Sequence, residues 1–422
     1  MTPDPDAQDR SAPWGLLALL TLLNVLNFLD RHLLAAAAPR LVAELRLTNA
    51  QLGFLVGFAF VAFFAVATLF VGALADRLSR TRLIAAGVVL WSIMTAATGA
   101  ASAFTGLAAA RLFIGLGEAV LVPAALSLLA DRFPAWRLGL ACGLFWAGLP
   151  VGRALSYFVA ATLVPEVGWR ACFYVLGAAG LPLAAALLFV ADTPRRVPEA
   201  PPSASSLGEA GRALSRLASL RWIVAGNVLA AVAGSASQLE VAWLTAERGF
   251  SPERAALAGG IVVTLASVVG NPLVGALGDR WERKRAGGRL RCLAIVLAAV
   301  MPLAAGFYVL TPGSAAFYAC WLAAQVALAA WPGTSSAAIQ DLVPVRIRAA
   351  TVAMVMAVVN LAGIGPGAWL AGAIGDALSL TAGLLAATAI GFLAVVPYVL
   401  AATSYPGPGQ GRTADEDAER RT

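Results

Sequence analysis

The sequence predicts an all-α integral membrane protein whose twelve transmembrane helices form two pseudo-symmetric six-helix bundles. Three observations predict this fold: the composition, the number of long apolar segments and an internal repeat. Of the 422 residues, 60% are hydrophobic and 13% are charged, and the mean hydropathy is +0.80. Soluble domains carry about 25% charged residues. The composition therefore indicates that the lipid bilayer is the main solvent of this chain.

The apolar segments match the length of membrane-spanning helices, which need about 20 mostly apolar residues. The first residues are acidic and contain proline, and the first apolar segment is long enough to remain in the membrane, so we expect an uncleaved anchor. Twelve segments qualify, six on each side of a polar stretch, near 13–38, 49–75, 82–103, 106–131, 138–164, 168–192, 220–246, 252–277, 290–311, 315–340, 348–374 and 379–403.

An internal repeat relates the two halves. The run GALADRLSRTR at 72–82 returns as GALGDRWERKR at 275–285, an offset of 275 − 72 = 203 residues. A duplicated half in a membrane-embedded chain is typical of a transporter with two bundles around a shared cavity. The positions that match are Gly72 with Gly275, Asp76 with Asp279, Arg77 with Arg280, Arg80 with Arg283 and Arg82 with Arg285.

The positive charge is distributed as in a membrane protein and forms no single basic patch. The N-terminus, the tail and the loops on one side hold 22 Arg or Lys residues, whereas the opposite loops hold five. Loops rich in Arg and Lys face the cytoplasm. We therefore expect a multi-pass protein of the cell inner (plasma) membrane with both termini cytoplasmic, in contact with the lipid bilayer and not with nucleic acid. The four cysteines lie in or beside apolar segments without CxxC spacing, so we expect core residues and no metal or cofactor site.

The polar stretch divides the chain into an N-terminal bundle (1–193), a cytoplasmic linker (194–219), a C-terminal bundle (220–404) and a disordered cytoplasmic tail (405–422). Apolar residues at helical spacing from Leu207 to Leu217 favour a short amphipathic helix on the cytoplasmic surface, with a flexible tether as the alternative. Glycine-rich segments are expected to pack closely, and to bend near Pro150, Pro272 and Pro366.

Ionisable side chains inside the spanning segments point to function, because they are costly to bury in a membrane. Counting residues from the outer helix ends at about 1.5 Å each predicts one layer with Asp30, Arg111 and Glu240, and a deeper layer with Glu118 and Arg153. The complete set is Asp30, Arg31 and His32 in the first segment, Arg111 and Glu118 in the fourth, Arg153 in the fifth, and Glu240 beside Gln238 in the seventh.

The spacing of these residues suggests ion pairs. Arg111 and Glu118 are seven residues apart, so they face the same side of their helix but are too distant for a direct pair. We therefore expect the pairs Asp30–Arg111 and Glu118–Arg153 across neighbouring helices. An acid beside an arginine exchanges its partner for a proton when an anionic ligand takes the arginine. Static bridges that only neutralise charge are the alternative.

We expect these ionisable residues and nearby aromatic residues to have distinct roles. Asp30 and Glu118 are predicted to couple protons, while His32 is expected to have an interfacial or packing role. The predicted substrate-binding residues are Arg31, Arg111, Arg153, Gln238, Glu240, Trp146 and Trp243. Phe28, Phe60, Phe64 and Phe145, with the two tryptophans, either line a surface for an apolar tail or belong to the core. Gly72, Asp76, Arg77, Arg80, Gly275, Asp279 and Arg280 are predicted to form a gate on the cytoplasmic side, and Arg170 to anchor a helix end or loop.

The chain resembles the major facilitator superfamily over nearly its whole length, since the two repeated runs are similar to the signature loops of that family. NFLDRHLLAAAAPRL, LTNAQLGFL, LWSIMTAATGAAS, RLFIGLGEA, the DRFP segment and GWRACFYVLG are similar to its spinster-like branch, whose eukaryotic members move lysophospholipids or sphingosine phosphate. The resemblance implies that Asp30 and Arg31 match an acidic–basic pair of the first helix, and that Arg111 and Glu118 match an RxxxGxGEA element implicated in proton coupling and substrate binding. Arg153 and Glu240 depart from the family pattern.

The predicted function is a proton-coupled, monomeric transporter that rocks two bundles around a cavity and moves an amphiphilic anion such as a lysolipid. The alternative is transport of a small organic anion or a drug-like compound, because RLFIGLGEA and GWR also resemble the anion:cation symporter branch. A membrane enzyme would need a nucleophile and base or a metal cluster, which a single histidine without clustered acids outside the helices does not provide. A sensor would usually add a soluble domain, which the sequence does not indicate.

Overall fold

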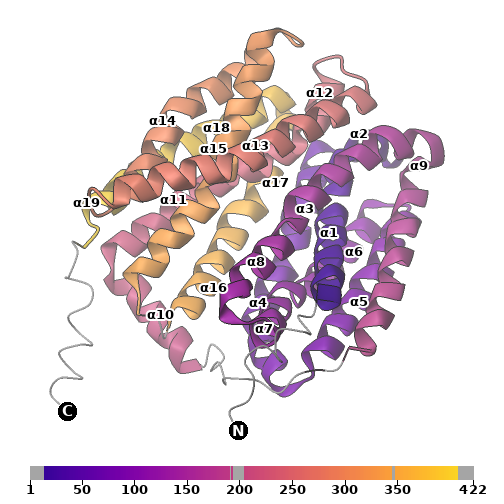
Figure 1. Ribbon diagram of the computed structural model, residues 1–422. Coiled ribbons are helices and arrows are strands. Elements are labelled where there is room, and N and C mark those ends of the chain that lie inside the picture. Colours follow the sequence, from indigo (N-terminus) through magenta and orange to yellow (C-terminus); the bar gives the residue numbers. More distant parts are fainter. Residues whose placement is uncertain (1–13, 191, 193–203, 345–346, 407–422) are drawn as a thin grey trace, which may run out of the picture.

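The computed structural model describes residues 14–190, 192, 204–344 and 347–406, and at 69–77, 135, 204–207, 271 and 349 it describes the backbone alone. Within these ranges all regular structure is helical. Figure 1 shows the helices gathered into two groups, one from each half of the chain. The all-α fold that the sequence predicts is confirmed.

The first half of the chain forms nine helices in the described part. They are α1 (Trp14–Ala36), α2 (Ala38–Leu45), α3 (Asn49–Val56), α4 (Phe58–Arg77), α5 (Arg80–Ala100), α6 (Phe104–Glu118), α7 (Leu121–Arg132), α8 (Ala135–Trp146) and α9 (Gly148–Leu188).

The second half begins after a connecting helix, α10 (Ala204–Arg216). It comprises α11 (Ala218–Ala236), the 3₁₀ turn η2 (Ser237–Leu239), α12 (Glu240–Ala246), α13 (Pro252–Glu282), α14 (Gly288–Val309), α15 (Ala315–Leu342), α16 (Arg348–Val359), the π-helical turn η4 (Asn360–Ile364), α17 (Gly365–Ala377), α18 (Leu380–Leu393) and α19 (Val395–Thr403).

Eleven helical stretches in the described residues are long and apolar enough to cross a membrane. One of them, Trp136–Leu188, contains 53 residues, whereas a single span needs about 20. It is interrupted at Gly168, where φ is 81° and ψ is 154°. Glycine adopts a positive φ readily because it has no Cβ. Counting this stretch as two spans gives the twelve that the sequence predicts.

Two breaks in the helices fall next to prolines. The chain breaks at Ala147 between α8 and α9, just before Pro150, and the π-helical turn η4 ends just before Pro366. Proline cannot donate the backbone hydrogen bond that would continue the preceding turn. Pro272, by contrast, lies inside α13 without interrupting it.

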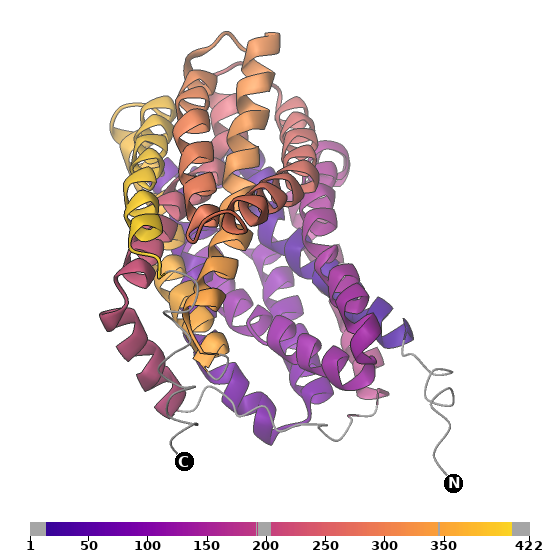
Figure 2. The same cartoon turned by 60° about the vertical axis from the view of Figure 1, so that its left-hand side comes forward.

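Each half has a core of its own. One buried cluster runs from Leu16 to Leu187 and another from Leu220 to Ala402. A third cluster contains residues of both halves, among them Leu33 and Trp243. The two bundles therefore share a core at one level of the molecule, and Figure 2 shows them side by side from a second direction.

The shared contacts lie on the side opposite the first and last described residues, which we call the far side; the other is the termini side. Asp376 accepts hydrogen bonds from the backbone N–H groups of Asn49 (2.8 Å) and Ala50 (2.9 Å), and Arg40 pairs with Glu253 at 2.7 Å. A Cβ added at Gly372 would lie 2.1 Å from the Asn49 carbonyl oxygen, so only glycine permits this approach. The bundles are thus closed against each other on the far side.

The connecting helix α10 packs against α16 and α11. It includes most of the segment from Leu207 to Leu217, for which the sequence favours an amphipathic helix. The predicted division into two bundles, a linker and a tail stays a prediction. Much of the linker (193–203) and of the tail (407–422) lies outside the described residues.

Candidate functional site

The candidate site begins with an ion pair between two helices of the N-terminal bundle. Arg31 on α1 approaches Glu118 at the end of α6, with Nη2 at 2.7 Å and Nε at 3.2 Å from the same carboxylate oxygen, Oε2. The Glu118 side chain is fully buried, whereas that of Arg31 is 23% exposed. The second carboxylate oxygen, Oε1, is buried without a hydrogen-bond partner.

Aromatic rings surround the charged end of Arg31. Its guanidinium carbon lies 4.4 Å from the ring centre of Phe60, 4.9 Å from Phe28 and 5.0 Å from Phe64. Such contacts stabilise a cation through the ring quadrupole. Three of the aromatic residues that the sequence offers for an apolar tail therefore enclose this arginine.

Asp30 points from α1 to a different helix than its neighbour Arg31. Its Oδ2 accepts a hydrogen bond of 2.7 Å from the Thr95 hydroxyl of α5, while Oδ1 is buried without a partner. Successive residues of a helix point in directions about 100° apart. Asp30 therefore faces α5, and Arg31 faces α6.

Arg111 is the least satisfied member of this group. It is 1% exposed, and its single hydrogen bond among the described residues goes from Nη2 to the Arg31 carbonyl oxygen at 3.3 Å. Nε and Nη1 are buried without partners. It interacts electrostatically with both Asp30 and Glu118. Buried polar groups without partners are rare in proteins, which makes Arg111 the clearest candidate in this group for an additional contact.

The structure corrects the ion pairs that the sequence predicts. Glu118 pairs with Arg31 and not with Arg153. Asp30 interacts with Arg111 through charge alone, and its direct partner is Thr95. The predicted layers stay a prediction, although Asp30, Arg111 and Glu118 interact electrostatically with one another. The expectation that Arg111 and Glu118 face the same side is confirmed, since both contact Arg31.

Glu240 forms a separate site in the C-terminal bundle. Its carboxylate accepts three hydrogen bonds, from Tyr308 Oη at 3.0 Å, from Trp321 Nε1 at 2.7 Å and from Gln325 Nε2 at 2.9 Å. The break at η2 starts the helix α12 at Glu240 and so directs its side chain toward α14 and α15. This carboxylate has a full set of donors, unlike those of Asp30 and Glu118.

Arg153 of α9 connects the two bundles electrostatically. It acts on Glu240 across the interface and lies beside Tyr157, one turn further along α9. Its Nε is buried without a hydrogen-bond partner. Tyr157 packs against Gly260 of α13, where an added Cβ would lie 2.7 Å from the tyrosine Cβ. Arg153 therefore interacts with Glu240, and not with Glu118 as the sequence predicts.

A cavity of about 430 Å³ extends from Arg153 between the bundles. Its wall on α13 includes Ser267, Gly275 and Asp279, and Arg289 of α14 lies at the same end as Asp279. Twelve residues separate Ser267 from Asp279, which corresponds to about 18 Å along a helix. The predicted substrate residue Arg153 and the predicted gate residues Gly275 and Asp279 thus line one cavity toward the termini side.

The other predicted substrate residues form no hydrogen bond with these charged groups among the described residues, although Trp243 packs on Tyr308 at 5.2 Å. Trp243 is fully buried in the core, donates a hydrogen bond of 2.7 Å to Thr381 and packs on Phe307. Trp146 is 42% exposed beside Phe145. Gln238 is partly buried in η2, and His32 is partly buried near Arg153. Their predicted roles stay predictions.

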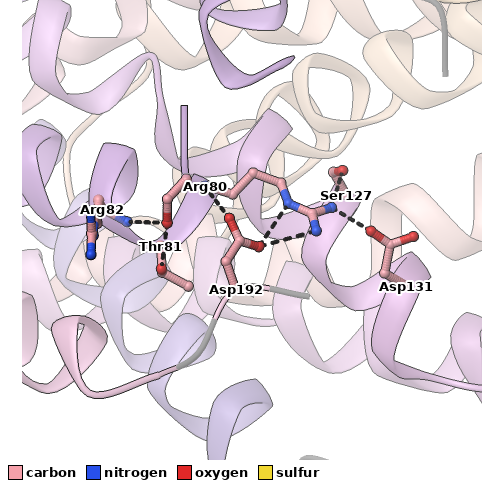
Figure 3. Close-up of polar contacts among 7 residues, drawn as sticks. Arg80, Thr81, Arg82, Ser127, Asp131 and Asp192 are labelled. Carbon is pink, nitrogen blue, oxygen red and sulfur yellow. Dashed lines mark hydrogen bonds and ion pairs between the residues drawn. The ribbon is translucent and has the colours of Figure 1, made fainter. Parts of the chain in front are cut away.

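At the termini side of the N-terminal bundle, Arg80 joins three segments of the chain (Figure 3). It is 2% exposed and pairs with Asp131 at 2.5 Å and with Asp192 at 3.1 Å. The carboxylate of Asp192 also accepts the backbone N–H of Arg80 at the start of α5, at 2.7 Å. The other predicted gate residues of this bundle, Gly72, Asp76 and Arg77, have side chains outside the described part.

The C-terminal bundle repeats this arrangement with different residues. Arg289, at the start of α14, pairs with Asp279 at 2.7 Å and also with Asp341, while Glu282 accepts the backbone N–H of Arg289 at 2.9 Å. Arg289 therefore takes the place of Arg80, which corrects the predicted match of Arg80 with Arg283. Arg280 is exposed.

Arg170 anchors a connection, as the sequence predicts. Its Nη1 donates to the carbonyl oxygens of Gly99 (2.9 Å) and Ala101 (2.6 Å), and the guanidinium pairs with Glu44 at 2.9 Å. The α5–α6 connection, α2 and α9 are thereby joined. Within the residues that the structure describes, no group of His, Cys, Asp and Glu could hold a metal ion.

Comparison with known proteins identifies related chains. The family model described as Major Facilitator Superfamily matches residues 20–311. An "MFS-type efflux pump" of Mycolicibacterium smegmatis is 30% identical over 281 residues, which cover 66% of each chain. The "Hexuronate transporter" of Escherichia coli K12 is 32% identical over 43% of this chain and 42% of its own length.

A spinster relative and a solved structure extend this comparison. The "Probable sphingolipid transporter spinster homolog 1" of Arabidopsis thaliana is 28% identical over 39% of this chain and 36% of its own length. A crystal structure of a bacterial homologue of the human lysosomal transporter Spinster, in an inward-facing and unoccupied conformation, superposes with a TM-score of 0.83. It is 23% identical and covers 94% of this chain and 98% of its own, so it shows the shared fold. The chain spans about two thirds of the efflux pump and less than half of the other two relatives.

Proposed function

The chain belongs to the major facilitator superfamily of membrane transporters, and from this membership we propose that it is a proton-coupled secondary active transporter of an amphiphilic anion. The proposed substrate is a lysophospholipid or a lipid similar to sphingosine phosphate. The protein works as a monomer in the cell inner membrane, with both termini in the cytoplasm, by alternating access between two bundles. The substrate and the proton meet at Arg31, Arg111, Asp30 and Glu118.

One observation carries this proposal: a buried ion pair stands beside a second arginine, Arg111, two of whose three nitrogens have no hydrogen-bond partner. Glu118 keeps one carboxylate oxygen free, and Arg111 keeps two nitrogens free, all of them buried. Two arginines and two carboxylates together are neutral when all are ionised. An anionic headgroup that joins the arginines upsets this balance, and a proton on Glu118 restores it.

The exchange follows from the geometry of the ion pair. The guanidinium of Arg31 is 23% exposed while Glu118 is fully buried, so an incoming anion meets the arginine first. Arg111 supplies the second set of N–H donors, because guanidinium groups bind phosphate and carboxylate in a forked geometry. Glu118, once separated from Arg31, takes up a proton because an unpaired buried carboxylate is unfavourable.

Alternating access requires the far side to open and the termini side to close. The contacts that break on the far side are the Arg40–Glu253 pair and the hydrogen bonds from α3 to Asp376. The cavity from Arg153 to Asp279 is the route on the termini side. Arg80 and Arg289, each held by carboxylates of its own bundle, keep the helix ends of this gate in place.

Two substrate classes are consistent with an arginine pair. The resemblance of the sequence to spinster-like transporters and the sphingolipid relative favour a lipid. The hexuronate relative, which matches over a similar length, favours the alternative of a small organic anion, and the efflux pump favours a drug-like compound. The aromatic residues Phe28, Phe60 and Phe64 beside Arg31 provide apolar contacts next to the headgroup site, so we place the lipid first.

The deciding experiment measures thermal stabilisation of the purified protein at two pH values. The ligands are lysophospholipids, sphingosine phosphate, hexuronates, other small organic acids and cationic drugs. Stabilisation by the lipids alone, stronger at one pH and absent in Arg111→Ala, supports the proposal. Stabilisation by short organic anions alone assigns the alternative substrate, and stabilisation by cationic drugs alone contradicts an arginine site.

A further inference from the structure

A second cavity, on the far side of the C-terminal bundle, has the features of a binding site for an anionic lipid. It measures about 530 Å³, within the range of about 300–1,000 Å³ that small-molecule sites occupy. Its wall comes from three places: the end of the α12–α13 connection, the first turns of α13, and the α14–α15 connection with the start of α15. None of its lining residues belongs to the central site.

Two arginines face this cavity without a carboxylate to neutralise them. Arg248 donates to the Leu310 carbonyl oxygen and stacks over Trp243 at 5.2 Å, but its Nε is buried without a hydrogen-bond partner. Arg254 is exposed in the first turn of α13, and no described carboxylate forms an ion pair with it. The cavity therefore carries two positive charges.

The two carboxylates nearest along the chain are both engaged elsewhere. Glu247 accepts hydrogen bonds from the backbone N–H groups of Leu380 (2.5 Å) and Thr381 (3.0 Å) at the start of α18. Glu253 pairs with Arg40 of the N-terminal bundle. Neither acid forms an ion pair with Arg248 or Arg254 among the described residues, so N–H donors of both arginines are left for a ligand.

The mouth of the cavity opens on a surface suited to an acyl chain. Arg254, Leu257, Ala258 and Ile261 all line it, and residues three, four and seven apart lie on one face of a helix. Leu257 is 49% exposed and Ile261 54%. The exposed apolar face continues through Leu265 (48%), Val268 (61%) and Val269 (51%).

The dimensions also agree with a lipid. From Leu257 to Val268 the helix rises about 16 Å, and one leaflet contributes about half of a hydrocarbon core that is roughly 30 Å thick. Arg254 lies in the first turn of this helix, where the length of the span leads us to expect the lipid headgroups. From these observations we propose that Arg248 and Arg254 bind the phosphate of an anionic membrane phospholipid, whose acyl chain lies along the exposed face of α13.

This site is independent of the proposed transport function, since it needs neither Glu118 nor Arg111. The test uses the full-length protein, freed of bound lipid in detergent, and native mass spectrometry. Three probes are titrated: phosphatidylglycerol, which is anionic, phosphatidylcholine, which is zwitterionic, and inorganic phosphate. The variants are Arg254→Gln, the double variant Arg248→Gln/Arg254→Gln, and Leu257→Ser/Ile261→Ser.

We expect phosphatidylglycerol to bind more tightly than phosphatidylcholine, and the double arginine variant to reduce that binding by about tenfold or more, which corresponds to about 1.4 kcal/mol. Arg254→Gln, whose side chain is exposed, should weaken binding without affecting the fold. Leu257→Ser/Ile261→Ser should weaken the lipid and leave phosphate unchanged. Arg46→Gln, an exposed arginine at the end of α2 outside the cavity, is the matched control.

Four results would overturn the proposal. Equal binding of the two phospholipids would mean that charge does not select the ligand. Binding of inorganic phosphate as tight as that of phosphatidylglycerol would assign a soluble anion and not a lipid. Unchanged phosphatidylglycerol binding in a folded Arg254→Gln variant, or the same loss in Arg46→Gln, would place the lipid elsewhere.

Discussion

The guanidinium of Arg31 binds one oxygen of Glu118 at 2.7 and 3.2 Å and leaves the other oxygen unpaired in a buried position. The arginine is partly accessible, whereas the carboxylate is not. An anion can therefore reach the arginine while the carboxylate stays within the protein. On the proposed function, this asymmetry would couple an anionic substrate to a proton.

Neutralising Glu118 should separate binding from proton coupling. Glu118→Gln retains an oxygen that accepts from Arg31 but has no charge to exchange, so we expect substrate-driven proton movement to be lost. Substrate binding should persist and should no longer depend on pH. The measurement is proton flux in liposomes that contain the purified variant, beside substrate binding at two pH values.

The control for this prediction is the folded state. Thermal unfolding of Glu118→Gln should stay close to that of the parent protein, because the hydrogen bond to Arg31 is retained. If transport by the variant depends on pH as it does in the parent protein, Glu118 is excluded as the coupling residue.

Removing Arg111 should weaken substrate binding. Arg111→Ala deletes two buried nitrogens that have no partner in the protein, and we expect anion binding at least about tenfold weaker, or about 1.4 kcal/mol. Arg111→Lys should also bind poorly, because an ammonium group does not present a forked pair of donors. Titration of the substrate by calorimetry measures the change, and normal binding by both variants would place the site elsewhere.

The fold could be predicted from the sequence because bilayer length and the repeat constrain it strongly. An apolar segment such as 82–103 must form a helix in a membrane, because only a helix satisfies all backbone hydrogen-bonding groups within the segment. The match of Arg80 with Arg283 was wrong for a local reason. The second copy carries six extra residues, because 289 − 80 is 209 and the offset of the repeat is 203. The runs DRFP at 131–134 and DLVP at 341–344 have an offset of 210, within one residue of 209.

The sequence predicts which charged residues form the candidate site, but it does not predict which of them contact one another. Charge inside the spans identifies Asp30, Arg31, Arg111 and Glu118, whereas counting residues from helix ends treats the helices as parallel rods. Partners such as Thr95 and Tyr308 are uncharged and carry no such signal. These partners are determined by how the helices pack against one another, and the spacing of residues along one helix does not predict that packing.

Glu240 should matter for stability more than Glu118. Three donors converge on its carboxylate, from Tyr308, Trp321 and Gln325. Glu240→Ala leaves all three donors without an acceptor, and each buried unsatisfied group costs about 1–3 kcal/mol. Thermal unfolding should therefore shift to clearly lower temperature in Glu240→Ala than in Glu118→Gln. Equal shifts would mean that these hydrogen bonds contribute little.

The two arginines on the termini side should differ in the same assay. The side chain of Arg80 is 2% exposed, and its partners Asp131 and Asp192 are 12% and 25% exposed. Arg289 is 20% exposed, and its partners Asp279 and Asp341 are about half exposed. Breaking a buried pair costs about 3–5 kcal/mol, whereas exposed pairs contribute about 0–1 kcal/mol. Arg80→Ala should thus destabilise the protein far more than Arg289→Ala, and the reverse order would contradict this interpretation.

Asp376 should control the opening of the far side. Its carboxylate accepts hydrogen bonds from the first two backbone N–H groups of α3, which belongs to the other bundle. Asp376→Ala removes this cap, which is worth about 1 kcal/mol, so the open population should rise by about fivefold. Spin labels at Arg46→Cys and Leu378→Cys, one on each bundle, report the separation by pulsed electron resonance in a background without the four native cysteines. Ser379→Ala is the matched control, since Ser379 caps α18 within its own bundle. A longer distance in Asp376→Ala but not in Ser379→Ala would show that the cross-bundle cap holds the far side closed. Equal distances would assign the closed state to the Arg40–Glu253 pair and apolar packing.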